Sequence, residues 1–348
     1  MDAFEPVRRV MNETLETGLF SAGCVDIGNE DGTVFRYMIG KTSRLPDAQD
    51  VNEKTLFDMA SCTKIMTVTM ITLQLVEQGI IALEDPVRRY FLDGVSAEAQ
   101  KITIGSLLRH SSGLPGHHSL IGCDRDHVAE AILAIPPAYP RDTKNDYACV
   151  GFILLGEILE KVTGKPLDQL AEERVFSVLG MKDTTFHPTG TNIAATRNKE
   201  PYAGVVHDFN ARYMGRPVGN AGVFSTIGDT ATFARMMLCE GAIGDARVLQ
   251  RGTMRLASQA QPPFTEEDRC LGFHLFRRGK NPAGELVSWK AFGHTGWTGT
   301  SIMADPERHM YMAVLTNSTY NYMDYYPRLW RFRRVLHNAG AVAMEING

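Results

Sequence analysis

The segment FDMASCTKIMTVTM, residues 57–70, places a hydroxyl and a cation at the start of an apolar run. Ser61 and Lys64 stand three residues apart, and side chains at this spacing lie on the same face of a helix. The apolar residues that follow predict a long helix from about Ser61 to Gln78, which Gly79 ends. A lone Ser-x-x-Lys also arises by chance, so a helix-capping serine beside a surface lysine is the alternative to a catalytic pair.

On such a helix the Lys64 ammonium can approach the Ser61 hydroxyl. An amine that is held away from water and near other cations loses proton affinity, so we expect Lys64 to act as a base toward the serine. Backbone N–H groups at the beginning of the helix could hold the oxyanion that forms in acyl transfer.

A second segment with suitable chemistry surrounds Tyr147. This residue precedes the apolar helical run VGFILLGEILEKVTG, residues 150–164, which places its ring at a helix entrance. A phenol at that point could move a proton between serine and leaving group. The structural alternative is a buried tyrosine whose hydroxyl is satisfied by its surroundings.

A third segment, FGHTGWTGTS, covers residues 292–301. It puts His294, Thr295 and Gly296 at the end of a predicted strand, and a strand edge can pair with an extended substrate. Gly296 permits close approach, and the Trp297 amide could be an oxyanion donor. A glycine-rich hairpin turn is the alternative explanation.

Strand patterns stand at both ends of the chain, and helical patterns dominate from about 85 to 260. A last amphipathic helix is predicted at 325–338. The strand patterns lie at 23–41 (a hairpin), 270–279, 284–293, 300–307 and 309–317.

This order predicts a mixed α/β (α+β) fold with two domains. Residues 1–84 and 262–348 would form one sheet domain from both chain termini, and residues 85–261 would form an inserted, mainly helical domain. The active site would lie in the cleft between them.

Composition excludes several function classes. The 348 residues are 44% hydrophobic and 22% charged, which is ordinary for a globular protein, and the formal net charge of −4 indicates no nucleic-acid partner. No apolar run reaches 18 residues, so no membrane span is expected. The basic segment RLWRFRR, residues 328–334, is better explained by a helix face packed on the sheet than by nucleic-acid binding.

The N-terminal segment and the cysteines favour a cytoplasmic protein. Val7, Val10 and Met11 recur at helical spacing, which predicts an amphipathic helix and not an export signal; the protein would be exported if a signal segment had been removed. The cysteines form no Cys-x-x-Cys pair and are best explained as reduced thiols. They are Cys24, Cys62, Cys123, Cys149, Cys239 and Cys270.

Taken together and in this order, the three segments resemble the penicillin-recognising serine hydrolases. The branch is the one that holds class C β-lactamases, D-Ala-D-Ala carboxypeptidases and β-lactamase-like esterases. The family's Ser-x-x-Lys matches residues 61–64, its Tyr-x-Asn matches 147–149, and its Lys/His-Thr-Gly matches 294–296. The stretches LLRHSSGLPG and VHDFNARYMGRPVGNAGVFST are also similar to the family. The resemblance covers about residues 15 to 335 and implies a β-lactamase/transpeptidase-like fold, with an antiparallel sheet flanked by helices.

The resemblance implies an acyl-enzyme mechanism that needs neither a metal nor an organic cofactor. Ser61 attacks an acyl carbonyl while Lys64 accepts its proton. Tyr147 works with Lys64 to protonate the leaving group and to activate water for deacylation. The backbone amides of Ser61 and Trp297 form the oxyanion hole. The substrate-binding positions are Cys149, His294, Thr295 and Gly296.

Two positions depart from the family's pattern. Cys149 stands where asparagine is usual, and a thiol is a weak donor and acceptor, so selectivity for an amide should relax toward esters. His294 replaces the lysine common in β-lactamases, and a histidine of ordinary pKa is mostly uncharged at neutral pH. Both departures favour an esterase over a dedicated β-lactamase.

Three functions stay open on the sequence. The favoured one is a serine hydrolase that cleaves a small ester or amide. The second is a D-Ala-D-Ala carboxypeptidase or D-aminopeptidase, or a weak β-lactamase. The third, a non-catalytic ligand-binding relative, is disfavoured by the intact catalytic residues. The expected partner is a small ester, amide or peptide, and the oligomeric state is open.

The segment GHHSLIGCDRDH, residues 116–127, concentrates possible metal ligands. Their spacing fits no standard zinc pattern, and Asp124 suits the N-cap of a helix, so we expect a polar loop beside the cleft and no metal site. A metal site is the less favoured alternative. The ligands concerned would be His117, His118, Cys123, Asp126 and His127.

Overall fold

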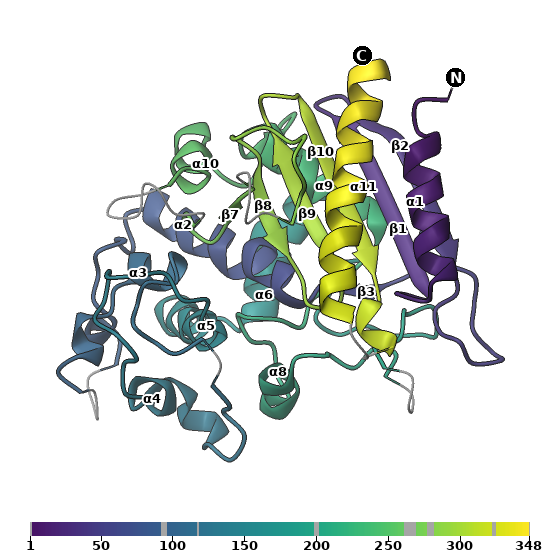
Figure 1. Cartoon of the computed structure of the whole chain (residues 1–348). Coiled ribbons are helices and arrows are strands. Elements are labelled where there is room, and N and C mark those ends of the chain that lie inside the picture. Colours follow the sequence, from purple (N-terminus) through teal and green to yellow (C-terminus); the bar gives the residue numbers. More distant parts are fainter. Residues whose placement is uncertain are drawn as a thin grey trace.

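The computed structural model shows a central sheet beside a group of helices (Figure 1). The structure describes residues 2–91, 96–116, 118–197, 202–260, 269–276, 282–321 and 325–347. Among these residues, six strands form one antiparallel sheet in the order β2-β1-β10-β9-β8-β7. The strands are β1 (Ala22–Asn29), β2 (Gly32–Gly40), β7 (His274–Leu275), β8 (Phe292–Thr295), β9 (Ser301–Asp305) and β10 (Met310–Thr316).

The predicted helices are present, several of them shorter than their patterns. The helices are α1 (Glu5–Glu16), α2 (Met70–Glu77), α3 (Ile104–Leu108), α4 (Val128–Leu133), α5 (Cys149–Thr163), α6 (Leu167–Ala171), α7 (Ser177–Leu179), α8 (Phe209–Met214), α9 (Ile227–Leu238), α10 (Arg251–Ala257) and α11 (Tyr325–Asn347). Two short two-stranded sheets, β3 (Phe57–Asp58) with β4 (Phe224–Ser225) and β5 (Ala242–Ile243) with β6 (Ala246–Arg247), lie outside the main sheet.

Both faces of the sheet are buried, because side chains alternate between two hydrophobic clusters. On β1, Val25 and Ile27 join the cluster that contains residues of α1 and α11, whereas Cys24 joins the cluster that contains residues of α9. On β10, Met312 joins the cluster with residues of α1 and α11, and Leu315 joins the cluster with residues of α9. Figure 1 shows α1 and α11 in front of the sheet and α9 behind it.

The predicted fold class is confirmed, with the sheet built from both ends of the chain and helices between. The residue limits of the two predicted domains stay a prediction. One helix of the predicted helical domain, α9, packs against β1, β9 and β10 of the sheet.

One predicted strand is wrong. Residues 284–291 form turns, and only Phe292 and Gly293 of the predicted 284–293 strand belong to β8. Side chains take the backbone donors that a strand would use: the Asn338 amide oxygen accepts the N–H groups of Glu285 and Leu286, and the Asp305 carboxylate accepts that of Ser288.

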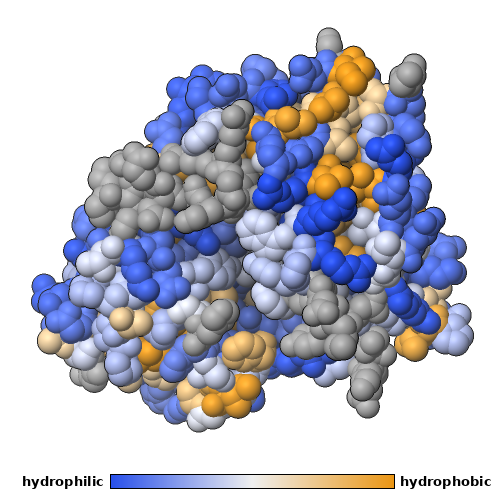
Figure 2. Space-filling model, viewed as in Figure 1, coloured by the Kyte–Doolittle hydropathy of each residue, from blue (hydrophilic) through white to orange (hydrophobic). Residues whose placement is uncertain are grey.

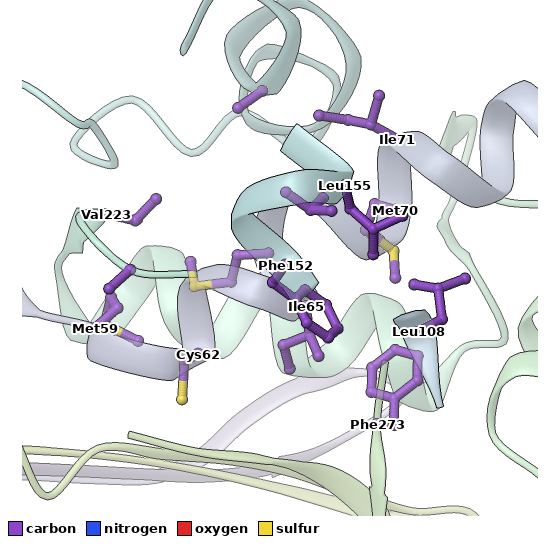
Figure 3. Close-up of a cluster of buried hydrophobic side chains, with 14 of the residues drawn as sticks. Met59, Cys62, Ile65, Met70, Ile71, Leu108, Phe152, Leu155, Val223 and Phe273 are labelled. Carbon is purple, nitrogen blue, oxygen red and sulfur yellow. The ribbon is translucent and has the colours of Figure 1, made fainter. Parts of the chain in front are cut away.

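The predicted helix that carries Ser61 and Lys64 is continuous but not uniform. A 3₁₀ turn (Ala60–Cys62) is followed by a π-helical segment (Ile65–Thr69) and then by α2. Gly79 ends it in the left-handed region, as predicted. Figure 3 shows Ile65 and Met70 of this segment beside Phe152 and Leu155 of α5, so apolar packing fixes the helix beneath the site.

On the surface, Figure 2 shows hydrophilic residues over most of the visible face and hydrophobic side chains along the C-terminal half of α11. Val342 and Ile346 of that helix are 40% and 66% exposed. None of the described helices has the length and apolar character that a membrane crossing requires.

Candidate active site

The turn before Ser61 is strained and is held by a buried carboxylate. Ala60 has φ = 45°, a left-handed conformation that costs a residue with a Cβ about 1 kcal/mol. The Asp58 carboxylate accepts the Ala60 N–H at 2.8 Å and the N–H of His207 at 2.7 Å. This pair of bonds fixes the turn that presents Ser61 at the start of its helix.

Asp58 itself was not predicted as part of the site. Burial raises the pKa of its carboxyl to about 6, against the opposing effect of the two backbone donors. The residue lies inside the quoted segment FDMASCTK, but its partner His207 is 149 residues away in the chain.

Lys64 is fully buried, and its ammonium has polar partners from three segments. It donates to Ser61 Oγ at 3.0 Å, to the Asn220 carbonyl oxygen at 2.8 Å and to Cys149 Sγ at 3.6 Å. The predicted Ser–Lys contact is therefore present.

The pKa of Lys64 departs from the expectation of a lowered value. Burial lowers it, but negative charge on the neighbouring Cys149 thiol and Tyr147 phenol raises it more, and the net direction is upward. The expectation of a lowered pKa assumed neighbouring cations, whereas Cys149 and Tyr147, which can become anionic, dominate the electrostatics around Lys64.

Tyr147 lies two residues before α5, as its place in the sequence predicted. Its ring centre is 5.0 Å from Lys64 Nζ. The phenol oxygen is buried, and the Lys64 ammonium and the Ser61 hydroxyl are the polar groups that act on it. Burial raises the pKa of Tyr147, although the Lys64 charge opposes this.

The His110 ring packs against the Tyr147 ring. Its ring centre is 4.5 Å from that of Tyr147, and its Nδ1 accepts the N–H of Ala148 at 3.2 Å. Because Nδ1 is an acceptor, the neutral ring carries its proton on Nε2. Our sequence analysis did not identify this residue as part of the site, although it stands in the stretch LLRHSSGLPG that resembles the family.

His294 has the opposite tautomer. Its Nδ1 lies 2.8 Å from the Thr295 carbonyl oxygen, so Nδ1 donates and Nε2 keeps its lone pair. Burial and the charges of Lys64 and Arg269 hold the pKa of His294 well below its usual range. The prediction that His294 is uncharged at neutral pH agrees with this direction.

A further histidine stands beside His294 and was not predicted. The ring centres of His274 and His294 are 4.8 Å apart, and both rings lie within 6.3 Å of that of Tyr147. Arg269 stacks over the Tyr147 ring at 5.0 Å. Tyr147 is therefore surrounded by imidazoles and cations.

The Gly296 turn packs directly against the Ser61 turn. A Cβ on Gly296 would lie 2.6 Å from the Met59 carbonyl oxygen, so only glycine fits there. Thr298 Oγ1 donates to the Asp58 carbonyl at 2.7 Å, and Thr300 Oγ1 donates to that of Met59 at 3.1 Å.

The end of β8 keeps part of an open edge. Within the described residues, β7 pairs only with Phe292 and Gly293 of β8, so His294 and Thr295 pair on the β9 side alone. The half-buried Thr295 thus lies on an open strand edge, as the sequence predicted, and the turn with Trp297 follows it.

The predicted residues therefore fall into two adjoining groups. Lys64 brings Ser61 and Cys149 together beside Tyr147, and His294 flanks the tyrosine. Thr295, Gly296 and Trp297 follow on the turn that touches the Ser61 segment.

The segment 116–127 is polar, as expected. His117 lies outside the described residues. Asp124 caps the following 3₁₀ turn, as predicted, and pairs with His127 at 2.7 Å. Over the described part of the chain, no group of three or more histidine, cysteine or acidic side chains could hold a metal ion.

Comparison with known proteins identifies the family of this chain. The family model described as Beta-lactamase matches residues 8–334. The chain belongs to the beta-lactamase family.

Proteins similar to this chain carry different activities in their names. A protein of Escherichia coli (strain K12) named as a D-alanyl-D-alanine carboxypeptidase is 32% identical over 307 residues, which cover 77% of this chain and 70% of the relative. A solved hydrolase with promiscuous acyltransferase activity has a TM-score of 0.80 at 19% identity and 98% coverage of both chains. A family VIII carboxylesterase has a TM-score of 0.71 at 21% identity, covering 91% of this chain and 92% of its own. The two solved structures show the shared fold.

Proposed function

We propose that this member of the beta-lactamase family is a serine hydrolase that cleaves a small ester through a covalent acyl-Ser61 intermediate. The observation that carries the proposal is the hydrogen bond of 3.0 Å between Lys64 Nζ and Ser61 Oγ. A buried lysine within hydrogen-bond reach of a serine hydroxyl is the arrangement that nucleophilic catalysis requires.

In acylation, Ser61 Oγ attacks the substrate carbonyl carbon and its proton passes to the unprotonated form of Lys64. The negative charge that develops on the carbonyl oxygen is held by the backbone amides of Ser61 and Trp297. The tetrahedral intermediate then expels the leaving group, which takes a proton from the neutral phenol of Tyr147. Lys64 returns its proton to the tyrosine.

In deacylation, water attacks the acyl carbonyl and gives a proton to the Lys64–Tyr147 pair, which returns it to Ser61 Oγ as the acid leaves. The raised pKa values of both groups mean that the resting site holds an ammonium and a phenol. The reactive unprotonated state is therefore a minor one at neutral pH.

Ester preference is supported by the place of Cys149. Its thiol stands at the position where the family's asparagine would bind a substrate amide. Cys149 Sγ accepts a hydrogen bond from Lys64 Nζ at 3.6 Å. A site without that amide partner forfeits selectivity for peptides and lactams over esters.

A second candidate, D-Ala-D-Ala carboxypeptidase activity, is favoured by one observation. The E. coli relative that carries this name shares 32% identity over most of both chains. In that case the substrate would be a peptide that ends in D-alanine.

The test compares three substrates on one enzyme: a p-nitrophenyl ester, a penicillin and a D-Ala-D-Ala peptide. Product release is followed together with the intact mass of the protein. We expect rapid ester turnover with little penicilloyl adduct. A long-lived penicilloyl mass on Ser61, with faster peptide than ester cleavage, would contradict the ester assignment and support the second candidate.

A further inference from the structure

Two aromatic side chains stand exposed beside the turn that follows the His-Thr-Gly motif. Trp297 is 47% exposed and Tyr326, at the start of α11, is 45% exposed. Their rings are stacked with centres 5.4 Å apart and an interplanar angle of 29°. Trp330, one turn further along α11, meets the Tyr326 ring edge-on at 6.1 Å.

The stack joins the turn after β8 to the start of α11, and hydrogen bonds hold these two segments together. Arg333 of α11 is buried, and its guanidinium donates to the carbonyl oxygens of Gly296 at 2.6 Å and Thr300 at 2.8 Å. The turn that carries Trp297 is therefore fixed to the helix that carries Tyr326. An exposed aromatic surface held in this way is preorganised for binding.

In the proposed mechanism the stack also lies close to the reacting atoms, because Trp297 supplies both an oxyanion donor and a ring of the stack. In the proposed mechanism the backbone amide of Trp297 binds the carbonyl oxygen of the substrate, and its indole extends from the same Cα. A group attached to that carbonyl thus needs to reach only one side-chain length to meet the ring.

Resting on the proposed function, we propose that Trp297 and Tyr326 form a platform that binds a flat apolar acyl group, so that esters of aryl-bearing acids are the preferred substrates. Stacked aromatic pairs attract one another beyond what the burial of their area contributes. The size of the platform fits a small molecule: two aromatic rings offer at most about 500 Å², whereas a stable protein interface needs about 800 Å² from each partner.

Boronic acids test the platform, because boron bonds to the nucleophilic serine and carries its single carbon substituent where the acyl group would be. The probes are methylboronic acid and 2-phenylethylboronic acid, measured as inhibition constants on the full chain. We expect the phenylethyl compound to bind the wild-type protein more tightly. Tyr326→Ala should weaken this compound about threefold to tenfold and leave methylboronic acid unchanged.

Two further variants separate stacking from general disruption. Tyr326→Phe keeps the ring and should retain the affinity of the wild-type protein for the phenylethyl compound. Trp289→Ala removes another exposed tryptophan, 58% exposed in the turns before β8, and should change neither constant.

Equal effects of Tyr326→Ala on both boronic acids, or no effect on either, would overturn the platform while leaving the proposed function intact. Failure of the wild-type protein to form any boronate adduct at Ser61 would instead overturn the proposed function and the platform that rests on it.

Discussion

The two halves of the site differ in how fully their polar groups are paired. In the nucleophile half, Lys64 has three partners and the Asp58 carboxylate accepts two N–H groups. In the recognition half, which comprises the imidazoles around Tyr147, Nε2 of His110, His274 and His294 is buried without a hydrogen-bond partner among the described residues.

Buried polar atoms without partners are rare in folded proteins, so three of them around one phenol require an explanation. The charged groups of Lys64 and Asp58 are paired before substrate arrives, whereas the imidazoles have a donor or an acceptor left for water or substrate. Hydrogen bonds from the protein thus fix the groups that act on the substrate carbonyl. The unpaired imidazoles remain available to contact the substrate.

Removing Lys64 from the nucleophile half should lower the rate of hydrolysis most. Lys64→Met keeps an unbranched side chain of similar volume but removes the proton acceptor, so kcat/KM for ester hydrolysis should fall about 10²- to 10⁴-fold. The control is Lys165→Met, which removes an exposed lysine paired with Glu173 and should leave the rate unchanged. An ester rate in Lys64→Met equal to that of the wild-type protein would contradict the role of the lysine.

The pH dependence of the rate should separate the two halves. Because the pKa values of Lys64 and Tyr147 are raised, the unprotonated base becomes more populated as pH increases, and kcat/KM should rise about tenfold per unit between pH 7 and 9. The histidines hold lowered pKa values, since burial and nearby cations disfavour their charged forms. A flat alkaline profile, or an inflection near pH 6.5, would contradict this assignment of charges.

Asp58 offers a measure of how much the burial of its carboxylate costs the folded protein. Its pKa is about 6 in the folded protein against an ordinary value of 3.8, so folding favours the protonated carboxyl. The resulting stabilisation is present below about pH 4 and is lost as pH rises through 6. The free energy of unfolding of the wild-type protein, relative to Asp58→Asn, should therefore fall by about 3 kcal/mol across this range.

Denaturant unfolding at pH 4 and pH 7 measures this difference. Asp31→Asn, in the exposed turn between β1 and β2, is the control and should follow the wild-type protein. A difference between the wild-type protein and Asp58→Asn that does not change with pH would show that the Asp58 carboxylate is not destabilised by burial.

The smallest expected effect concerns the choice between amide and ester substrates. Cys149→Asn restores an amide donor and acceptor at the position where the family binds substrate amides, so turnover of a penicillin or a D-Ala-D-Ala peptide should rise about tenfold relative to ester turnover. Cys149→Ser, which is small and polar but has no amide, is the matched control. No gain in Cys149→Asn would mean that other residues set the selectivity.

Much of the nucleophile half could be predicted from local spacing. The interval between Ser61 and Lys64 fixes their shared helix face, and the apolar run after Tyr147 places the phenol at the entrance of α5. The pKa of Lys64 could not be predicted, because its direction depends on Cys149 and Tyr147, which are more than 80 residues away in the chain.

The supporting residues were missed for the same reason. His110 binds the Ala148 N–H, and Asn220 offers its backbone oxygen to Lys64, contacts that only the folded chain brings about. The wrong strand at 284–293 had a strand-like pattern, but the Asn338 and Asp305 side chains occupy its backbone donors. Long-range side-chain contacts of this kind leave no periodic signal in a sequence.

The most direct test of the central claim is the intact mass of the protein after incubation with a fluorophosphonate, followed by peptide mapping. A single adduct on Ser61 in the wild-type protein, and none in Ser61→Ala, is the predicted result. Wild-type protein that stays unlabelled, or an adduct on another residue that persists in Ser61→Ala, would contradict the assignment of Ser61 as the nucleophile.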